Sequence, residues 1–141
     1  MKPRIATPML NNFFATYRIY FEDTDAGGVV YYANYLKFFE RARTDFLRAL
    51  NISQSELAAM ENLIFVVRKC QIEYISPAKL DDLVKVTVAV KEIHAASIVM
   101  QQEIKRSDKI LSTLNVEIVC VAADNFRPKK IPTNIKNLFD V

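Results

Sequence analysis

The chain has 141 residues, of which 51% are hydrophobic and 25% are charged, with a net charge of +3. This length predicts a single domain, residues 1–141, with a substantial hydrophobic core, and the composition excludes a disordered protein. The charge is too small to indicate nucleic-acid binding, but it suits an anionic ligand such as a phosphate-bearing cofactor.

The sequence also indicates where the protein acts. Basic residues near the N-terminus are not followed by the apolar segment of a signal peptide, and no apolar run is long enough to span a membrane. Cys70 and Cys120 fall in strand-like segments without Cys-x-x-Cys spacing, so we expect two buried free thiols in a reducing compartment. We therefore predict a cytoplasmic protein with no membrane span.

The first predicted element is a strand over residues 13–21, which are rich in aromatic and β-branched side chains. An acidic turn follows, and it contains both glycines of the chain, Gly27 and Gly28. Glycine is favoured where φ is positive or where backbone must approach a ligand closely. This turn is therefore the first place to look for a functional site.

Apolar residues at helical spacing predict a long helix over residues 35–50. Leu36 and Ala49 widen its apolar stripe to more than half of the helix surface, so we expect other elements to enclose most of it. Ser53 and Glu56 have the spacing of a capping box, which predicts a second, short helix ending at Met60.

Strands account for most of the remaining chain. The predicted strand segments, bounded by Ser76-Pro77 and by the polar turn 105–109, are residues 63–67, 70–74, 84–90, 98–104 and 110–121. Residues 127–132 then end the sheet and lead into a short tail. This order predicts an α+β fold in which an antiparallel sheet curls around one helix. One sheet face stays exposed in such a layout, so we expect subunits to pair as a homo-oligomer.

Several chemistries are excluded by residue types that the chain lacks. His94 is the only histidine, and we interpret it as an exposed loop residue rather than a general base. A Ser-His-Asp hydrolase would need an exposed nucleophile such as the serine of Gly-x-Ser-x-Gly, which is absent. One histidine and two distant cysteines do not make a zinc site, and no nucleotide-binding glycine motif occurs.

Carboxylate chemistry at Glu22, Asp23 and Asp25 remains. The turn could also be a solvated hairpin, or Asp23 and Asp25 could form part of a metal site, although one short pair is weak support for a metal. Against both alternatives, the turn leads into the most apolar helix, whose first N–H groups lack intrahelical partners. A carboxylate beside such donors can activate water or attack directly while the donors hold a developing oxyanion, which suits hydrolysis of an activated carbonyl.

These residues resemble the hotdog-fold acyl-CoA thioesterases, most closely the YbgC-like branch and its 4-hydroxybenzoyl-CoA thioesterase relatives. The motif that carries the resemblance is Tyr20-x-x-Asp23-x-Asp25-x-x-Gly28-x-Val30-Tyr31-x-x-Asn34-Tyr35-x-x-Phe38-x-Glu40-x-Ala42-Arg43. Further landmarks are Tyr74-Ile75-Ser76-Pro77-Ala78 followed by Asp82, and Cys120-Val121 followed by Arg127-Pro128 and Ile131-Pro132. The likeness thus covers nearly the whole chain.

The resemblance implies a central helix wrapped by an antiparallel sheet, in dimers or tetramers with active sites at subunit interfaces. It implies that Asp25 is the nucleophile or general base and that the backbone N–H of Tyr32 is the oxyanion donor. Gly28, three residues after Asp25, would let backbone approach the thioester, while Gly27 would only ease the bend. The YbgC-like branch usually carries histidine at position 32, and the tyrosine here leaves substrate preference open.

Other polar residues have structural and functional interpretations. We expect Asp23 to orient the turn and Glu40 to pair with Arg41, Arg43 or a neighbouring chain. Arg127, Lys129 and Lys130 form a basic cluster that is either a solvated charge run or a site for the CoA phosphates, particularly across a subunit boundary.

The predicted function is hydrolysis of a fatty or aromatic acyl-CoA to free acid and CoA, with no cofactor and no metal. The alternative is a binding module that holds acyl-CoA or an acidic acyl carrier protein and organises lipid or envelope enzymes. A hotdog dehydratase is disfavoured because His94 lies too far along the chain from the motif.

Overall fold

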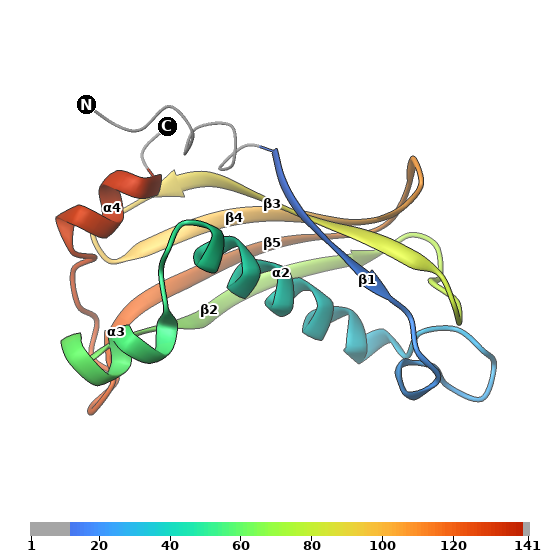
Figure 1. Ribbon diagram of the computed structural model, residues 1–141, viewed down its shortest axis with the longest axis horizontal. Coiled ribbons are helices and arrows are strands. Elements are labelled where there is room, and N and C mark those ends of the chain that lie inside the picture. The colour runs from blue at the N-terminus through green and yellow to red at the C-terminus, as the bar shows by residue number, and fades with distance from the viewer. Residues whose placement is uncertain (1–11, 140–141) are drawn as a thin grey trace.

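The computed structural model describes residues 12–139, which form a curved antiparallel sheet, one long helix and several short ones (Figure 1). The elements are β1 (Phe13–Arg18), η1 (Phe21–Asp23), η2 (Tyr32–Asn34), α2 (Tyr35–Ala49), α3 (Gln54–Glu61), β2 (Leu63–Tyr74), β3 (Leu83–Ile93), β4 (Ser97–Arg106), β5 (Lys109–Ala122) and α4 (Thr133–Phe139). The predicted α+β class is confirmed.

The five strands lie in the order β1-β3-β4-β5-β2, and every neighbouring pair is antiparallel. Alternation of valines in β3 places Val84, Val86 and Val88 on the buried face. Because side chains alternate across a strand, the residues between them point to the opposite face. β1 and β2 form the two edges of the sheet.

The core lies between the sheet and α2, which runs along one face of it (Figure 1). Phe38, Phe39, Ala42 and Phe46 are all buried on the sheet-facing side of the helix. The other side of α2 is open, and Leu36 is 41% exposed. The expectation that other elements enclose most of the helix is therefore wrong within this chain, because the sheet curls around only one side.

The element boundaries differ from the sequence prediction in three places. β1 ends at Arg18, because residues 21–23 turn into η1. β2 is one continuous strand rather than two, with a bulge between Val67 and Lys69. α4 was not predicted from the sequence. No helix among residues 12–139 is long and apolar enough to cross a membrane.

The two cysteines occupy different environments. Cys120 is buried as predicted, and burial raises its pKa to about 11. Cys70 is exposed, so the prediction of two buried thiols is wrong for this residue. It follows the bulge in the edge strand β2.

Candidate active site

The acidic turn begins with η1, whose shape depends on Asp23. The Asp23 Oδ2 accepts a hydrogen bond from the backbone N–H of Tyr20 at 2.8 Å, across the whole of η1. Its backbone carbonyl accepts from the Tyr31 N–H at 3.1 Å and from the Asn34 Nδ2 at 3.0 Å. The prediction that Asp23 orients the turn is confirmed, and the same residue ties the turn to the start of α2.

Asp25 lies at the tip of this turn and is exposed. Its Oδ1 accepts a hydrogen bond from the Gly27 N–H at 2.8 Å, and its carbonyl accepts from the Gly28 N–H at 3.1 Å. These two bonds hold the carboxylate over the paired glycines. The second carboxylate oxygen has no hydrogen bond within residues 12–139.

The two glycines have different structural roles in the turn. Gly28 has φ +80°, a conformation that side chains disfavour, so the bend itself requires this residue. Gly27 instead donates the N–H that binds Asp25, and a Cβ placed there would lie 3.3 Å from the Asp25 Oδ1. Gly27 therefore does more than ease the bend.

The short helix η2, just before α2, leaves one backbone donor open. Tyr32 is the first residue of η2, and within residues 12–139 its backbone N–H forms no hydrogen bond. Asn34 precedes α2 but makes no capping bond to it, since its side chain amide donates to Asp23. The Asn34 and Tyr35 N–H groups bond to the carbonyls of Tyr31 and Tyr32, so the open donor at this helix start is the Tyr32 N–H, near the positive end of the helix dipole.

Aromatic side chains surround this helix start. The Tyr74 hydroxyl, from the end of β2, donates to the Tyr32 carbonyl at 3.0 Å, and the Tyr35 hydroxyl accepts from the Ala78 N–H at 3.0 Å. The Tyr31 and Tyr32 rings are tilted by 45° with centroids 4.9 Å apart, and the neighbouring Tyr32 hydroxyl raises the pKa of Tyr31. Partial burial raises the pKa of Tyr74. Sequence analysis noted Tyr74 only as part of a motif, since nothing in the sequence links it to residue 32.

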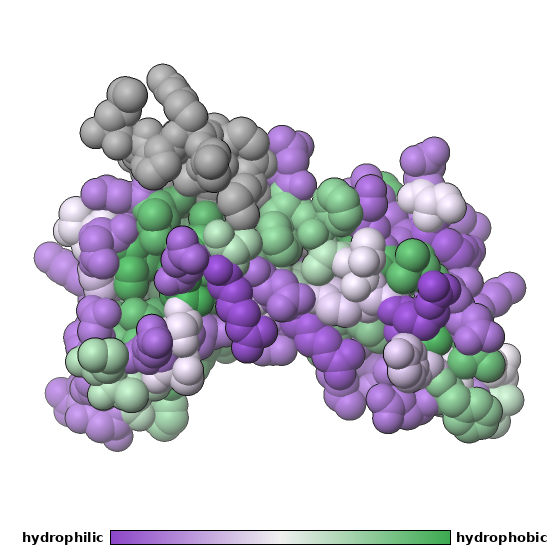
Figure 2. Space-filling view, in the orientation of Figure 1, coloured by the Kyte–Doolittle hydropathy of each residue, from purple (hydrophilic) through white to green (hydrophobic). Residues whose placement is uncertain are grey.

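These aromatics are accessible. Tyr32 is 62% exposed, and Tyr20, Phe21 and Tyr31 are exposed with it. Figure 2 shows hydrophobic and hydrophilic residues side by side at the lower right, the end at which Figure 1 places the loop after β1. Such a patch around open donors is typical of a surface that a ligand or another subunit covers.

Comparison with known proteins identifies the family. The family model described as the thioesterase-like superfamily matches residues 19–139. The chain belongs to this superfamily.

Its similarity to individual thioesterases is also extensive. It is 46% identical over 132 residues to an acyl-CoA thioesterase YbgC of Haemophilus influenzae, covering 93% of this chain and 97% of the relative. It is 43% identical over 119 residues to an acyl-CoA thioester hydrolase YbgC of Escherichia coli, covering 84% and 88%. A solved structure of a probable thioesterase from Bartonella henselae superposes with a TM-score of 0.82 at 35% identity, covering 86% of this chain and 99% of that one. The resemblance to the YbgC-like branch and the hotdog fold are confirmed.

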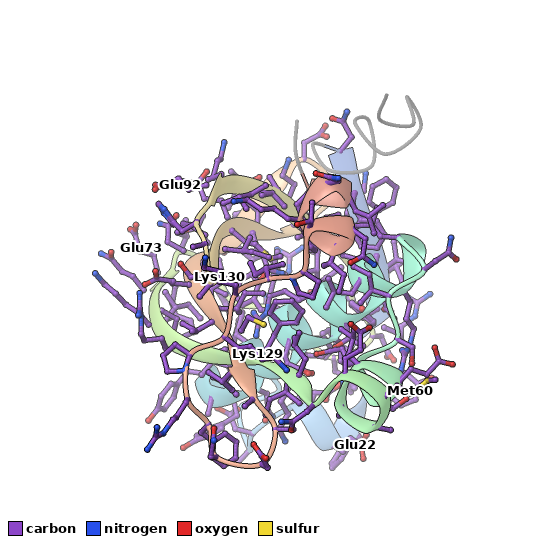
Figure 3. All side chains as sticks on the ribbon, turned by 90° about the vertical axis from the view of Figure 1, so that its left-hand side faces the viewer. Glu22, Met60, Glu73, Glu92, Lys129 and Lys130 are labelled. Carbon is purple, nitrogen blue, oxygen red and sulfur yellow. The ribbon has the colours of Figure 1, made fainter. Side chains whose placement is uncertain are left out.

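The basic cluster of this thioesterase-like chain lies away from the acidic turn. Arg127, Lys129 and Lys130 are exposed after the end of β5, beside α3, whereas the loop after β1 is at the opposite end of the molecule (Figure 1). The Lys129 Nζ donates to the carbonyls of Glu61 and Asn62, at 2.9 and 3.4 Å, which end α3 (Figure 3). One chain therefore does not bring the cluster to Asp25.

Glu40 and His94 have ordinary surface environments. Glu40 is exposed and accepts a hydrogen bond from the Thr44 hydroxyl at 3.3 Å, and among residues 12–139 it forms no ion pair with Arg41 or Arg43. His94 is exposed, as predicted, with its Nε2 3.0 Å from a Glu92 carboxylate oxygen. The described residues contain no group of three or more side chains suited to hold a metal.

Proposed function

We propose that the protein hydrolyses acyl-CoA thioesters to a free acid and CoA, with Asp25 as the nucleophile or general base. The observation that supports this proposal best is the pairing of two features at one end of the molecule. One is a carboxylate held by the Gly27 N–H, and the other is the Tyr32 N–H at the start of η2, which forms no hydrogen bond within residues 12–139. The named activities of the YbgC relatives are consistent with it.

In the proposed reaction, the thioester carbonyl lies between the Asp25 carboxylate and the Tyr32 N–H. As a general base, Asp25 accepts a proton from water while the water oxygen attacks the carbonyl carbon. The carbonyl electrons move to oxygen, and the Tyr32 N–H donates a hydrogen bond to the resulting oxyanion. Collapse expels the CoA thiolate, which takes up the proton. As a nucleophile, Asp25 would attack the carbonyl carbon itself and expel the CoA thiolate. Water would then hydrolyse the mixed anhydride to the free acid and the Asp25 carboxylate, and the thiolate would take up the proton that this releases.

We further propose that this single-domain chain works as a homo-oligomer, a dimer or a dimer of dimers. β2 is a 12-residue edge strand with exposed Val67 and Tyr74, and such an edge is a template for pairing with another chain. Only a second subunit could bring Arg127 and Lys130 to a substrate bound at Asp25, where they would contact CoA phosphates. Gly28 would allow close approach of backbone to the thioester. A cytoplasmic location accords with CoA as the substrate carrier.

The test is Asp25→Asn, assayed by thiol release across a panel of acyl-CoAs of different chain length and aromatic character. We expect turnover to fall ~10²-fold or more, because a positioned base contributes about that factor. The fold should be unaffected, since Asp25 is exposed. Glu22→Gln, an exposed carboxylate in the same turn, is the matched control and should stay near wild type. Near-normal turnover by Asp25→Asn would reject the assignment of Asp25.

The same panel tests the alternative of a binding module for acyl-CoA or an acyl carrier protein. The exposed Arg127 and Lys130 would also suit an acidic carrier protein. Tight binding of every acyl-CoA without thiol release would favour the module over the enzyme.

A further inference from the structure

We propose that the ion pair between Asp82 and Arg106 is a positioning device for the acidic turn, acting through the loop of residues 77–82. This inference rests on the proposed role of Asp25. Neither residue belongs to the turn or to the helix start. Arg106 is the last residue of β4, and Asp82 immediately precedes β3.

The loop is bonded to the chain just before the acidic turn. The Ile19 N–H donates to the Asp82 carbonyl at 2.8 Å, and the Asp81 N–H donates to the Ile19 carbonyl at 3.0 Å. Ile19 is buried and follows the last residue of β1. This pair of bonds therefore fixes the point at which the chain leaves the sheet and enters the turn.

The same loop is bonded to the chain just after Asp25. The Val30 N–H donates to the Ala78 carbonyl at 2.8 Å, and the Leu80 N–H donates to the Gly28 carbonyl at 3.3 Å. The loop thus contacts the backbone on both sides of Asp25. A displacement of the loop would move both ends of the turn together.

The Asp82 carboxylate and Arg106 keep this loop folded. One Asp82 oxygen, Oδ2, accepts from the Lys79 N–H at 2.8 Å and from the Arg106 Nη1 at 2.6 Å. The Arg106 Nη1 also donates to the Pro77 carbonyl at 3.2 Å. Arg106 therefore joins the first and last residues of the loop and anchors them to the sheet. Asp81 sits in the loop with φ +71°, a conformation that needs such support.

A second arginine–carboxylate pair in the same sheet provides a matched comparison. The Arg68 Nη2 lies 2.7 Å from the Glu117 Oε2, but the Arg68 side chain is 59% exposed, whereas that of Arg106 is 31% exposed. Arg68 contacts neither the loop nor the turn in the described contacts. Solvent screens an exposed pair more strongly, so the Asp82–Arg106 pair should hold its geometry better.

The experiment compares Arg106→Gln, Arg106→Lys and Arg68→Gln by kcat, KM and unfolding temperature. We expect Arg106→Gln to lower kcat about 10-fold with KM within about 2-fold, because small displacements of reacting groups cost rate rather than binding. Arg106→Lys should recover most of kcat, since a single nitrogen makes both loop contacts. Arg68→Gln should leave kcat unchanged.

Each outcome either supports or overturns the proposed role of the Asp82–Arg106 pair. An Arg106→Gln protein with wild-type kcat, or with only a raised KM, overturns the proposal, as does an equal loss in Arg68→Gln. If Arg106→Gln does not fold, the single variants Asp82→Asn and Arg106→Lys are compared instead. Wild-type kcat in Asp82→Asn then overturns the proposal. An inactive Asp25→Asn beside a fully active Arg106→Gln rejects only the positioning device. An active Asp25→Asn instead rejects the proposed role of Asp25.

Discussion

The starts of helices α2 and α3 lie at opposite ends of the core and are treated differently by the fold. At the start of α3, the Ser53 hydroxyl accepts a hydrogen bond from the Glu56 N–H at 3.3 Å. At the start of α2, Asn34 makes no such bond, and the Tyr32 N–H before it has no partner within residues 12–139. One helix start is capped by its own side chain, whereas the other follows a short helical turn whose first N–H has no partner in the described part of the chain.

The difference shows where the fold gives up a capping hydrogen bond. An Asn at a helix N-cap normally accepts from the helix N–H groups. Here its side chain instead donates to the Asp23 carbonyl, so it fastens the acidic turn to the short helix η2, whose first N–H, that of Tyr32, has no partner among residues 12–139. The surroundings also differ, since exposed Tyr31 and Tyr32 lie at the start of η2, whereas the Ser53 hydroxyl lies 3.1 Å from the Ser55 hydroxyl. Open donors beside a positioned carboxylate are the arrangement that thioester hydrolysis needs.

Removal of the open Tyr32 N–H is expected to have the largest effect on the difference between the two helix starts. Tyr32→Pro deletes the backbone N–H at the first position of η2, where proline is compatible with a helix start. The preceding Tyr31 has φ −60° and ψ 132°, which suits a residue before proline. We expect kcat to fall about 10²-fold or more, as when other oxyanion donors are removed. Tyr32→Phe keeps the N–H and should stay within about 2-fold of wild type. Equal activities in the two variants would contradict a backbone donor.

A smaller effect is expected from straining the acidic turn. Gly28→Ala places a side chain at φ +80°, which costs about 1–2 kcal/mol. We expect kcat/KM to fall by roughly 5–30-fold, the ratio that corresponds to this energy. Gly28→Asn should recover part of the loss, because asparagine tolerates positive φ better than alanine does. Wild-type kcat/KM in Gly28→Ala, measured by thiol release, would show that the bend does not set the position of Asp25.

Loss of the Ser53 cap at the start of α3 should change the stability of the protein but not its activity. Ser53→Ala removes the cap of α3 and should lower the free energy of unfolding by about 1 kcal/mol. Chemical denaturation measures this loss, and Ser55→Ala, which removes a hydroxyl that does not cap the helix, serves as the matched control. We expect kcat of Ser53→Ala to equal that of wild type. A marked loss of kcat would mean that α3 also contributes to the site.

Sequence patterns anticipated the elements whose side chains repeat regularly. Helical spacing predicted residues 35–50, and α2 spans Tyr35–Ala49. Alternating valines predicted β3, and Ser53 was correctly identified as the cap of α3. These predictions succeed because hydrophobic periodicity and capping depend on residues that are near one another in the chain.

Other features depend on contacts between distant segments. The bulge that joins the two predicted segments into β2 is visible only in its pairing with β5. The exposure of Cys70 and Leu36 follows from which side of each element lacks a neighbour in this chain. The hydrogen bond from Tyr74 to Tyr32 joins residues 42 positions apart, and sequence reasoning gave Tyr74 no role at the helix start.

The sequence alone predicted the α+β class and the acidic turn from residue type and local spacing, and the family resemblance of its motif then singled out Asp25 as the candidate catalytic residue. Tertiary structure decided how the turn is held. It separated the two glycines by φ, left the Tyr32 N–H without a partner within residues 12–139, and placed the 77–82 loop against the backbone on both sides of Asp25. It also placed the basic cluster Arg127, Lys129 and Lys130 at the end of the molecule opposite the acidic turn. These outcomes depend on backbone hydrogen bonds and packing between segments far apart in sequence, which no local pattern encodes.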